Sequence, residues 1–248
     1  MKRRVKAPRT LVVGIGNTTL FCGVFSGARR ERTFRLLNSD LAQLAVRADA
    51  RIDRAAVCSV VPKQTSKITG LIERQWKVKA RVLTANSPHG LTLNYRQPRE
   101  LGTDRLAAAM GAYDAFPGEN IIVVDCGTAT TITALRSDGT LLGGAILPGL
   151  GLWPEMLATR TAQLPRVPVA RPRVALGRST REGIASGVFF GHCGAVREVV
   201  SRVRTEAFGR APVRVVGTGG YAPLFSRENL FGALQPDLVL RGLLVLAG

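Results

Sequence analysis

Two short segments of the sequence combine an apolar run with a glycine turn that is rich in hydroxyl side chains. They are LVVGIGNTT at residues 11–19 and IVVDCGTAT at residues 122–130. Glycine lets a backbone come close to a ligand, and the N–H groups of such a turn point at an anion. The turn hydroxyls that can add hydrogen bonds belong to Thr18, Thr19, Thr128 and Thr130. We expect the two turns to face each other across a cleft and to bind the phosphates of a nucleotide. Asp125, at the end of the second apolar run, can hold a cation directly or through water.

A second set of candidate residues is the segment GTDR at residues 102–105, which opens a predicted helix. Two interpretations stay open. Thr103 or Asp104 can cap the helix. Alternatively, Asp104 takes a proton from a substrate hydroxyl while Arg105 binds an anionic group of that substrate, as carboxylate bases do in phosphoryl transfer.

Glycines also mark two later segments. GTGG at residues 217–220 follows a predicted strand and lets a flat ring approach the backbone, or it is a plain turn. Gly183, Gly187 and Gly191, with Gly194 near the same side, form a stripe along a predicted helix and suggest close approach of another helix or a second subunit. We interpret the neighbouring His192 as a packing or surface residue rather than a ligand, and Trp76 and Trp153 as core or interface residues.

The elements that position these residues alternate between strands and helices, which indicates an α/β fold with a mixed sheet in each half. The pattern restarts after about residue 118, since a shift of 111 positions aligns Val12 with Val123, Gly16 with Gly127 and Thr19 with Thr130. Strands are predicted over residues 10–16, 19–25, 32–37, 55–61, 119–127, 128–136, 140–147 and 213–220. Helices are predicted over residues 41–48, 64–76, 101–115, 179–205 and 237–247.

Composition limits the function classes. The 248 residues are 46% hydrophobic and 21% charged, which is typical of a globular chain. No apolar run is long enough to span a bilayer, and the basic start lacks a signal-peptide pattern, so we expect a cytoplasmic protein with no membrane partner. The four widely spaced cysteines argue against zinc sites and disulfides and indicate buried thiols. The net charge of +18 invites a nucleic-acid partner, but outside residues 1–9 the charges are scattered, which makes such a partner an unfavoured interpretation.

Taken together, the chain resembles the type III pantothenate kinases, a family that includes the Bvg accessory factor proteins. The resemblance runs from about Thr10 to Gly242. It rests on the segments GIGNTTLFCGVF, CSVVP, YRQPRELGTDR, IVVDCGTATT, GGAILPGL, TAQLPRVPV, GRSTREGI and VVGTGGYAPL, in family order and spacing.

The resemblance implies the duplicated two-domain fold of the acetate and sugar kinase, heat-shock protein 70 and actin superfamily. The expected division is a basic tail at residues 1–9, an N-terminal half at 10–117 and a C-terminal half at 118–248. The implied activity is ATP-dependent phosphorylation of pantothenate to 4'-phosphopantothenate, the first step of coenzyme A biosynthesis. The implied cofactors are ATP, a divalent metal such as Mg²⁺ and a monovalent cation, potassium or ammonium. The implied assembly is a homodimer.

The resemblance also assigns roles to residues. Asp104 is the implied general base for the pantothenate hydroxyl. The implied substrate-binding residues are Tyr95, Gly102, Thr103, Asp104, Arg105 and Thr180, the last supplied across the dimer. Asp125 matches the monovalent-cation ligand. The implied ATP-binding residues are Gly14, Ile15, Gly16, Asn17, Thr18, Thr19, Leu20, Phe21 and Thr128.

One position departs from the family pattern. The first family motif reads D-x-G-N-T, and this chain has Gly14 where the motif has Asp. The family Asp resembles a group that organises the metal and phosphates of ATP, and losing one such electrostatic stabiliser typically costs about 10²–10³ in rate. The alternative function is therefore a catalytically impaired, kinase-like protein that binds pantothenate or nucleotide in a regulatory role.

Overall fold

The computed structural model describes residues 7–248, and its backbone contacts divide the chain into two compact units. Unit 1 contains the residues up to Leu91, Tyr95–Ala115 and Leu238–Gly248, and unit 2 contains Thr92–Asn94 and Phe116–Asp237. The predicted tail at residues 1–9 lies mostly outside the described residues, and its last residue, Arg9, begins the first strand. None of the helices within residues 7–248 combines the length and apolarity that a bilayer crossing requires.

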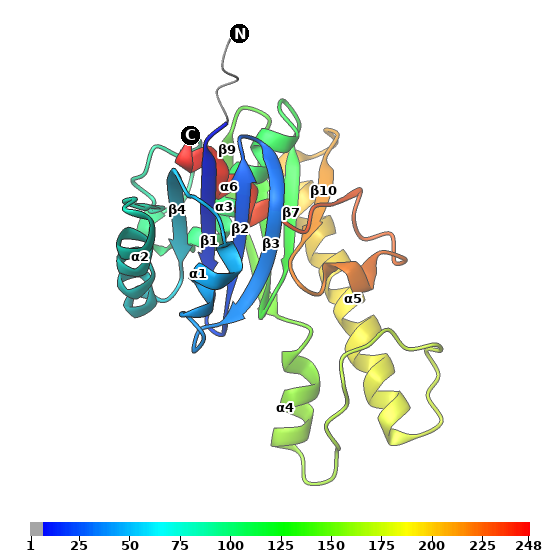
Figure 1. The fold of residues 1–248 in the computed structure, drawn as a ribbon. Helices are drawn as coiled ribbons and strands as arrows, with labels where there is room; N and C mark the ends of the chain where they lie inside the picture. Colours follow the sequence, from blue (N-terminus) through cyan, green and yellow to red (C-terminus); the bar gives the residue numbers. More distant parts are fainter. Residues whose placement is uncertain (1–6) are drawn as a thin grey trace. The chain divides into compact units, whose positions relative to one another are not determined.

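Unit 1 is built on a five-stranded mixed sheet with the order β3-β2-β1-β4-β5 (Figure 1). The strands are β1 Arg9–Ile15, β2 Thr19–Ser26, β3 Arg29–Leu37, β4 Arg54–Ser59 and β5 Arg81–Val82. Strands β1 and β2 form an antiparallel hairpin, and β4 runs parallel to β1 on its other side. The central strand β1 is apolar and buried on both faces, which is expected for a strand covered by helices on each side.

Helices cover both faces of this sheet. They are α1 Gln43–Ala48, α2 Pro62–Trp76, α3 Thr103–Ala115 and α6 Leu238–Ala247, and the short exposed helix η1 Pro98–Glu100 precedes α3. Side chains of α1 and α2, among them Leu44 and Ile68, share a buried cluster with Leu11 and Val13 of β1. The other face is covered by α6 and α3, which contact β1 and β4.

The packing of α3 on α6 is unusually close. A Cβ placed on Gly242 would overlap the carbonyl oxygen of Ala107, and one placed on Gly111 would overlap that of Leu238. The two glycines therefore let the helix backbones touch. This contact places α6 with unit 1, whereas the sequence analysis had placed residues 238–248 in the C-terminal half.

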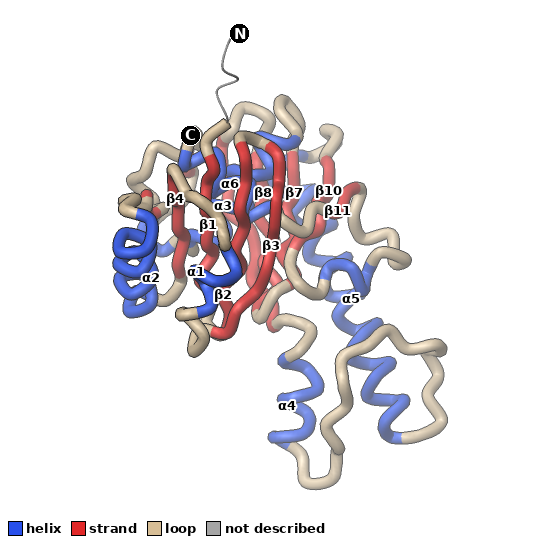
Figure 2. The backbone as a smooth tube through the Cα atoms, in the orientation of Figure 1, coloured by secondary structure: helices blue, strands red, loops and turns tan. Residues whose placement is uncertain are grey.

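Unit 2 is built on a six-stranded sheet with the order β11-β10-β7-β8-β9-β6 (Figure 2). Its strands are β6 Thr92–Leu93, β7 Ile121–Cys126, β8 Ala129–Leu135, β9 Thr140–Pro148, β10 Arg214–Thr218 and β11 Ala233–Leu234. Its helices are α4 Leu152–Arg160, α5 Thr180–Phe208 and η2 Ala222–Phe225. One face of the sheet shares a buried cluster with α5 and η2 that includes Ile122, Phe189 and Phe225.

The internal repeat predicted from the sequence corresponds to a repeated topology. In each unit an antiparallel hairpin is followed by a parallel strand on the outer side of its first strand, β1-β2 with β4 and β7-β8 with β10. One pairing in the predicted alignment is wrong. Ile15 pairs with Leu20, whereas Cys126 pairs with Thr130, so the second turn is one residue shorter. Thr130 therefore corresponds to Leu20 and not to Thr19.

Helix α4 was not predicted from the sequence. It contains Pro154 at its third position, and proline is tolerated in the first turn because no intrahelical bond to its nitrogen is required there. The other predicted helices and long strands are present with shifted ends. All four cysteines are free and buried, as the sequence analysis expected.

Candidate functional site

The first glycine turn lies at the carboxyl end of β1. Gly16 N–H donates to the Thr19 carbonyl (2.9 Å), which closes the turn and leaves the side chains of Asn17 and Thr18 exposed. The flanking side chains do not share this exposure, because Ile15 and Leu20 are buried in the core of unit 1. Of the predicted segment from Gly14 to Phe21, only Gly16–Thr19 thus presents polar groups to a ligand.

Asn38, which follows β3, holds this turn in place, and the sequence analysis missed it. Its Nδ2 donates to the carbonyls of Gly16 and Asn17 (2.9 Å each), and its backbone N–H donates to the Thr18 carbonyl (3.1 Å). Because the turn carbonyls are bound from one side, the turn keeps a fixed orientation. An asparagine just after a strand was the available signal, but its partners lie some 21 and 22 positions away in the sequence.

The GTDR segment is anchored to the same end of the sheet of unit 1. Thr103 Oγ1 donates to the Ser59 carbonyl (2.9 Å) and accepts from the Ser59 N–H (3.0 Å). Ser59 in turn pairs with Ile15 in the parallel ladder of β1 and β4. The start of α3 and the first glycine turn therefore lie at one edge of the sheet. The capping interpretation fails for Thr103, because its hydroxyl is bound to Ser59.

Asp104 and Arg105 take defined orientations at the start of α3. Asp104 Oδ1 accepts the backbone N–H of Arg105 (2.8 Å), and a Cβ on Gly102 would come within 2.6 Å of the same oxygen. Arg105 is 6% exposed, and its Nη1 lies 3.5 Å from the hydroxyl of Tyr95. Its guanidinium carbon stands 5.9 Å from the centroid of the tyrosine ring.

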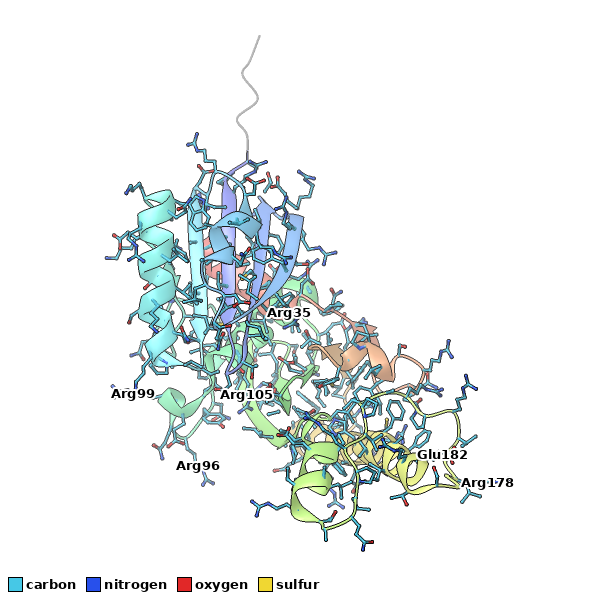
Figure 3. The ribbon with its side chains drawn as sticks, turned by 60° about the horizontal axis from the view of Figure 1, so that its bottom comes forward. Arg35, Arg96, Arg99, Arg105, Arg178 and Glu182 are labelled. Atoms are coloured by element: carbon cyan, nitrogen blue, oxygen red, sulfur yellow. The ribbon has the colours of Figure 1, made fainter. Side chains whose placement is uncertain are left out.

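The surroundings of these residues carry positive charge. Arg96 and Arg99, on the segment leading into α3, are exposed, and Figure 3 shows them at the same end of unit 1 as Arg105. A buried guanidinium beside a tyrosine hydroxyl can bind a small carboxylate in a fixed orientation. A carboxylate such as that of Asp104, half-buried and oriented by a backbone N–H, can accept a proton from a nearby hydroxyl.

Unit 2 carries the second glycine turn, at residues 127–129. Gly127 N–H donates to the Ala129 carbonyl (3.1 Å), and Gly149 N–H donates to the Thr128 carbonyl (3.1 Å). A Cβ on Gly149 would overlap the carbonyls of both Gly127 and Thr128. Glycine after β9 thus allows the chain to brace the turn at van der Waals distance, which gives the predicted segment GGAILPGL a physical role.

The end of β10 meets the same turn. Gly219 has φ +90°, and a Cβ on it would lie 2.7 Å from the backbone nitrogen of Cys126 and would overlap a carboxylate oxygen of Asp125. Tyr221 N–H donates to the Cys126 carbonyl (3.0 Å). The predicted GTGG turn therefore lies directly against Asp125. Burial raises the pKa of the Cys126 thiol to about 12, and the charge of Asp125 acts in the same direction.

Thr180 lies elsewhere in unit 2, at the first position of α5. Ser179 Oγ accepts the Glu182 N–H (3.3 Å), which caps the helix, and Glu182 Oε2 accepts the N–H of Arg178 (2.7 Å), the residue before the cap (Figure 3). Thr180 lies twelve residues before His192, which contacts Thr130; this is about 18 Å along the helix. Within unit 2 the structure does not bring Thr180 to the turn at residues 127–129.

Thr180 instead borders an apolar groove of about 680 Å³ between α4 and α5, lined among others by Trp153, Met156, Leu157 and Gly187. The predicted glycine stripe lies along this side of α5. No described atom beyond the helix's own backbone and the adjacent residues comes within 4 Å of a Cβ placed on Gly183 or Gly187, whereas Gly191 contacts the ring of Trp153.

Two units of one topology, in each of which a glycine turn closes the central hairpin, define a duplicated α/β fold. Solved structures with this architecture include a ROK family glucokinase from Streptomyces griseus in complex with glucose and AMPPNP (TM-score 0.53, 13% identity, covering 96% of this chain and 98% of that one). They also include a conserved Baf family protein from Campylobacter jejuni (TM-score 0.61, 20% identity, covering 95% of this chain and 96% of that one).

Sequence comparison identifies the family within this class. Residues 10–202 match the family model of the type III pantothenate kinases. A type III pantothenate kinase from Legionella pneumophila (strain Corby) is 38% identical over 245 residues, covering 94% of this chain and 96% of that protein. The chain belongs to the type III pantothenate kinase family.

Proposed function

We propose that this protein transfers a phosphoryl group from ATP to pantothenate, giving 4'-phosphopantothenate, the first step of coenzyme A biosynthesis. The observation that carries the proposal is the start of α3. There Asp104 and the buried Arg105, with Tyr95 beside it, are anchored through Thr103 and Ser59 to the edge of the sheet that bears the first glycine turn.

In this proposal the residues of unit 1 bind and activate pantothenate. Arg105 and Tyr95 bind its carboxylate, which fixes the molecule by the end remote from the reaction. The Asp104 carboxylate would accept the proton of the primary hydroxyl while that oxygen bonds to the γ-phosphorus of ATP, and the bond from that phosphorus to ADP would break as ADP leaves. Gly102 matters because its missing side chain leaves room for the Asp104 carboxylate to fold back over the start of α3. Orienting the nucleophile in this way is the main task of a base in phosphoryl transfer.

Each glycine turn, taken within its own unit, offers groups that suit a phosphate of ATP. When bound, ATP supplies the phosphoryl group, and Mg²⁺ neutralises charge on its phosphates. The turn at Gly16–Thr19 offers exposed hydroxyl and amide groups, and the turn at residues 127–129 offers Thr128. Asp125 would hold the monovalent cation. Mg²⁺ is commonly held by phosphates, waters and one or two carboxylates, so the phosphates of ATP would supply much of its coordination.

A homodimer is part of the proposal. The groove beside Thr180 is apolar, and the glycines along α5 leave room for another helix backbone. A second copy covering this groove would bury Met156, which is 51% exposed, and would bring Thr180 to its partner's substrate. We further propose a cytoplasmic location, since the free, buried thiols suit a reducing compartment.

A second candidate function is favoured by one observation, the glycine at position 14. The end of β1 carries no carboxylate there, so a protein of this fold could bind nucleotide or pantothenate without turnover. Such a protein would act through its bound state, in a regulatory role.

The test is pantothenate-dependent ADP release with Mg²⁺ and K⁺, together with calorimetric binding of each substrate. We expect turnover in the unmodified protein and a loss of about 10²- to 10⁴-fold in Asp104→Asn. The matched control is Asp114→Asn, which alters an exposed aspartate on the same helix and should leave the rate unchanged. Binding of both substrates without ADP release would favour the second candidate. Equal rates in Asp104→Asn and the unmodified protein would refute the role of Asp104.

A further inference from the structure

The core of unit 2 contains a histidine that the proposed mechanism does not use. His192, on α5, is 0% exposed. Its ring stacks on Phe225 (centroids 5.5 Å apart, planes at 25°) and meets Trp153 edge-on (5.9 Å, 89°). Its Nε2 lies 3.2 Å from the hydroxyl of Thr130, which is also fully buried. The two side chains thus form a hydrogen bond inside an aromatic cluster.

The imidazole is not the side chain that packing alone would select. No described residue is within hydrogen-bonding distance of its Nδ1, and the same holds for Nε1 of Trp153. A buried polar atom without a partner lowers stability, and burial lowers the pKa of His192, so the ring is neutral at neutral pH. A phenylalanine would fill the same space among Phe225, Phe189 and Trp153 without this cost. What the histidine adds is the bond to Thr130.

Thr130 is well placed to transmit this bond to the second glycine turn. It is the residue that pairs with Cys126 across the hairpin, so it closes the turn at residues 127–129. The backbone of the turn is already braced by Gly149 and Tyr221. The side chain of His192, which packs beneath the sheet, holds the same end of the hairpin through the hydroxyl of Thr130.

We propose that His192 is a positioning residue for nucleotide binding: by holding the Thr130 hydroxyl, its ring keeps the turn at residues 127–129 in the conformation that takes phosphate. This inference rests on the proposed function, because it assumes that the turn binds ATP. His192 touches neither substrate and acts only through Thr130.

The experiment measures the ATP dissociation constant in His192→Phe, Thr130→Val and the double variant, with melting temperatures alongside. We expect each single change to weaken ATP binding about 3- to 10-fold, the equivalent of one hydrogen bond. The double variant should bind like either single variant, because both remove the same interaction. Pantothenate affinity should not change. His192→Gln, which keeps a hydrogen-bonding nitrogen near the position of Nε2, should recover most of the affinity.

The melting temperature separates positioning from structure. His192→Phe should melt at the same temperature as the unmodified protein or above it, while binding ATP less tightly; a purely structural role predicts a lower melting temperature and unchanged affinity. The matched control is Thr140→Val, which removes a buried threonine hydroxyl at the far end of the β8–β9 hairpin and should leave ATP affinity intact.

The outcomes are distinguishable from failure of the proposed function. Unchanged ATP affinity in His192→Phe overturns the positioning role and leaves the kinase proposal standing. If the unmodified protein binds ATP without phosphorylating pantothenate, the kinase proposal fails, and the ranking of the variants still decides the role of His192. If the unmodified protein binds no ATP, both fail.

Discussion

Position 14 can be tested directly, because the structure defines what a side chain there would meet. A Cβ on Gly14 would stand 3.4 Å from Val239 Cγ1, 3.7 Å from the Phe21 carbonyl oxygen and 3.8 Å from Cys58 Sγ. These are ordinary contacts, so Gly14→Ala fits. Since glycine in a strand costs about 0.5–1 kcal/mol relative to alanine, this variant should be slightly more stable than the unmodified protein.

Gly14→Asp adds a carboxylate to the same buried place. Its neighbours would be a valine methyl, a thiol and a carbonyl oxygen, none of which neutralises an anion. An uncompensated buried charge costs about 3–5 kcal/mol. For a chain of this size each kcal/mol shifts the melting temperature by about 2–4 °C, so a cost of about 3 kcal/mol corresponds to about 6–12 °C. We therefore expect the melting temperature of Gly14→Asp to lie about 6–12 °C below that of Gly14→Ala.

The assay is a thermal melt of both variants with and without Mg²⁺-ATP, followed by pantothenate-dependent ADP release. If the carboxylate is enclosed by Val239 and Cys58, then Mg²⁺-ATP should raise both melting temperatures equally, and Gly14→Asp should not outpace the unmodified protein. The reasoning is refuted if Mg²⁺-ATP closes the gap and turnover rises by about 10²–10³, the effect expected from restoring one electrostatic stabiliser. In that case the carboxylate reaches the metal-bound phosphates.

Three further predictions concern other parts of the chain. Asn38→Ala removes the two side-chain bonds that hold the first turn, and should raise the KM for ATP about tenfold in steady-state assays with the KM for pantothenate unchanged. Gly242→Ala forces a methyl group into the Ala107 carbonyl and should lower the unfolding free energy by about 3 kcal/mol in urea titrations. The matched control is Gly70→Ala in helix α2, which should raise the unfolding free energy by up to about 1 kcal/mol. Burial lowers the pKa of His192 in the folded state, so as the pH falls the unfolded chain takes up this proton before the folded protein does. The unfolding free energy should therefore decrease as the pH drops below about 6.5. In His192→Phe the urea midpoint should depend less on pH between pH 7.5 and 5.5.

Much of the fold could be predicted because it depends on local patterns. The β1–β2 and β7–β8 hairpins each combine a buried apolar run with a glycine turn, and both are read directly from residues 11–19 and 122–130. The repeated topology followed from the same comparison. The length of the second turn did not, because a one-residue difference is visible only in the strand pairing of Cys126 with Thr130.

The missed features are contacts between distant residues. The close packing of Gly111 on α6 joins segments more than a hundred residues apart, and no local pattern marks it. Asn38 looks like an ordinary residue after a strand until its bonds to Gly16 and Asn17 are seen. His192 was interpreted as a packing or surface residue; it is indeed packed, but its bond to Thr130 depends on how α5 lies against β8.

For the site residues too, the sequence predicts the neighbours along the chain but not the contacts between distant segments. Thr103, Asp104 and Arg105 lie together with Tyr95, as contiguous or nearby residues should. Asp125 and Gly219 come together because β7 and β10 are parallel neighbours, which sequence alone did not establish.

The discontinuous composition of unit 1 has a consequence for biosynthesis. Its sheet and α3 leave the ribosome early, but the helix that covers their second face, α6, is translated only after the whole of unit 2. Nascent unit 1 therefore exposes the Ala107–Gly111 surface of α3 until the last helix of the chain has left the ribosome. The core of unit 1 can be completed only after synthesis has ended, although most of its strands are made first.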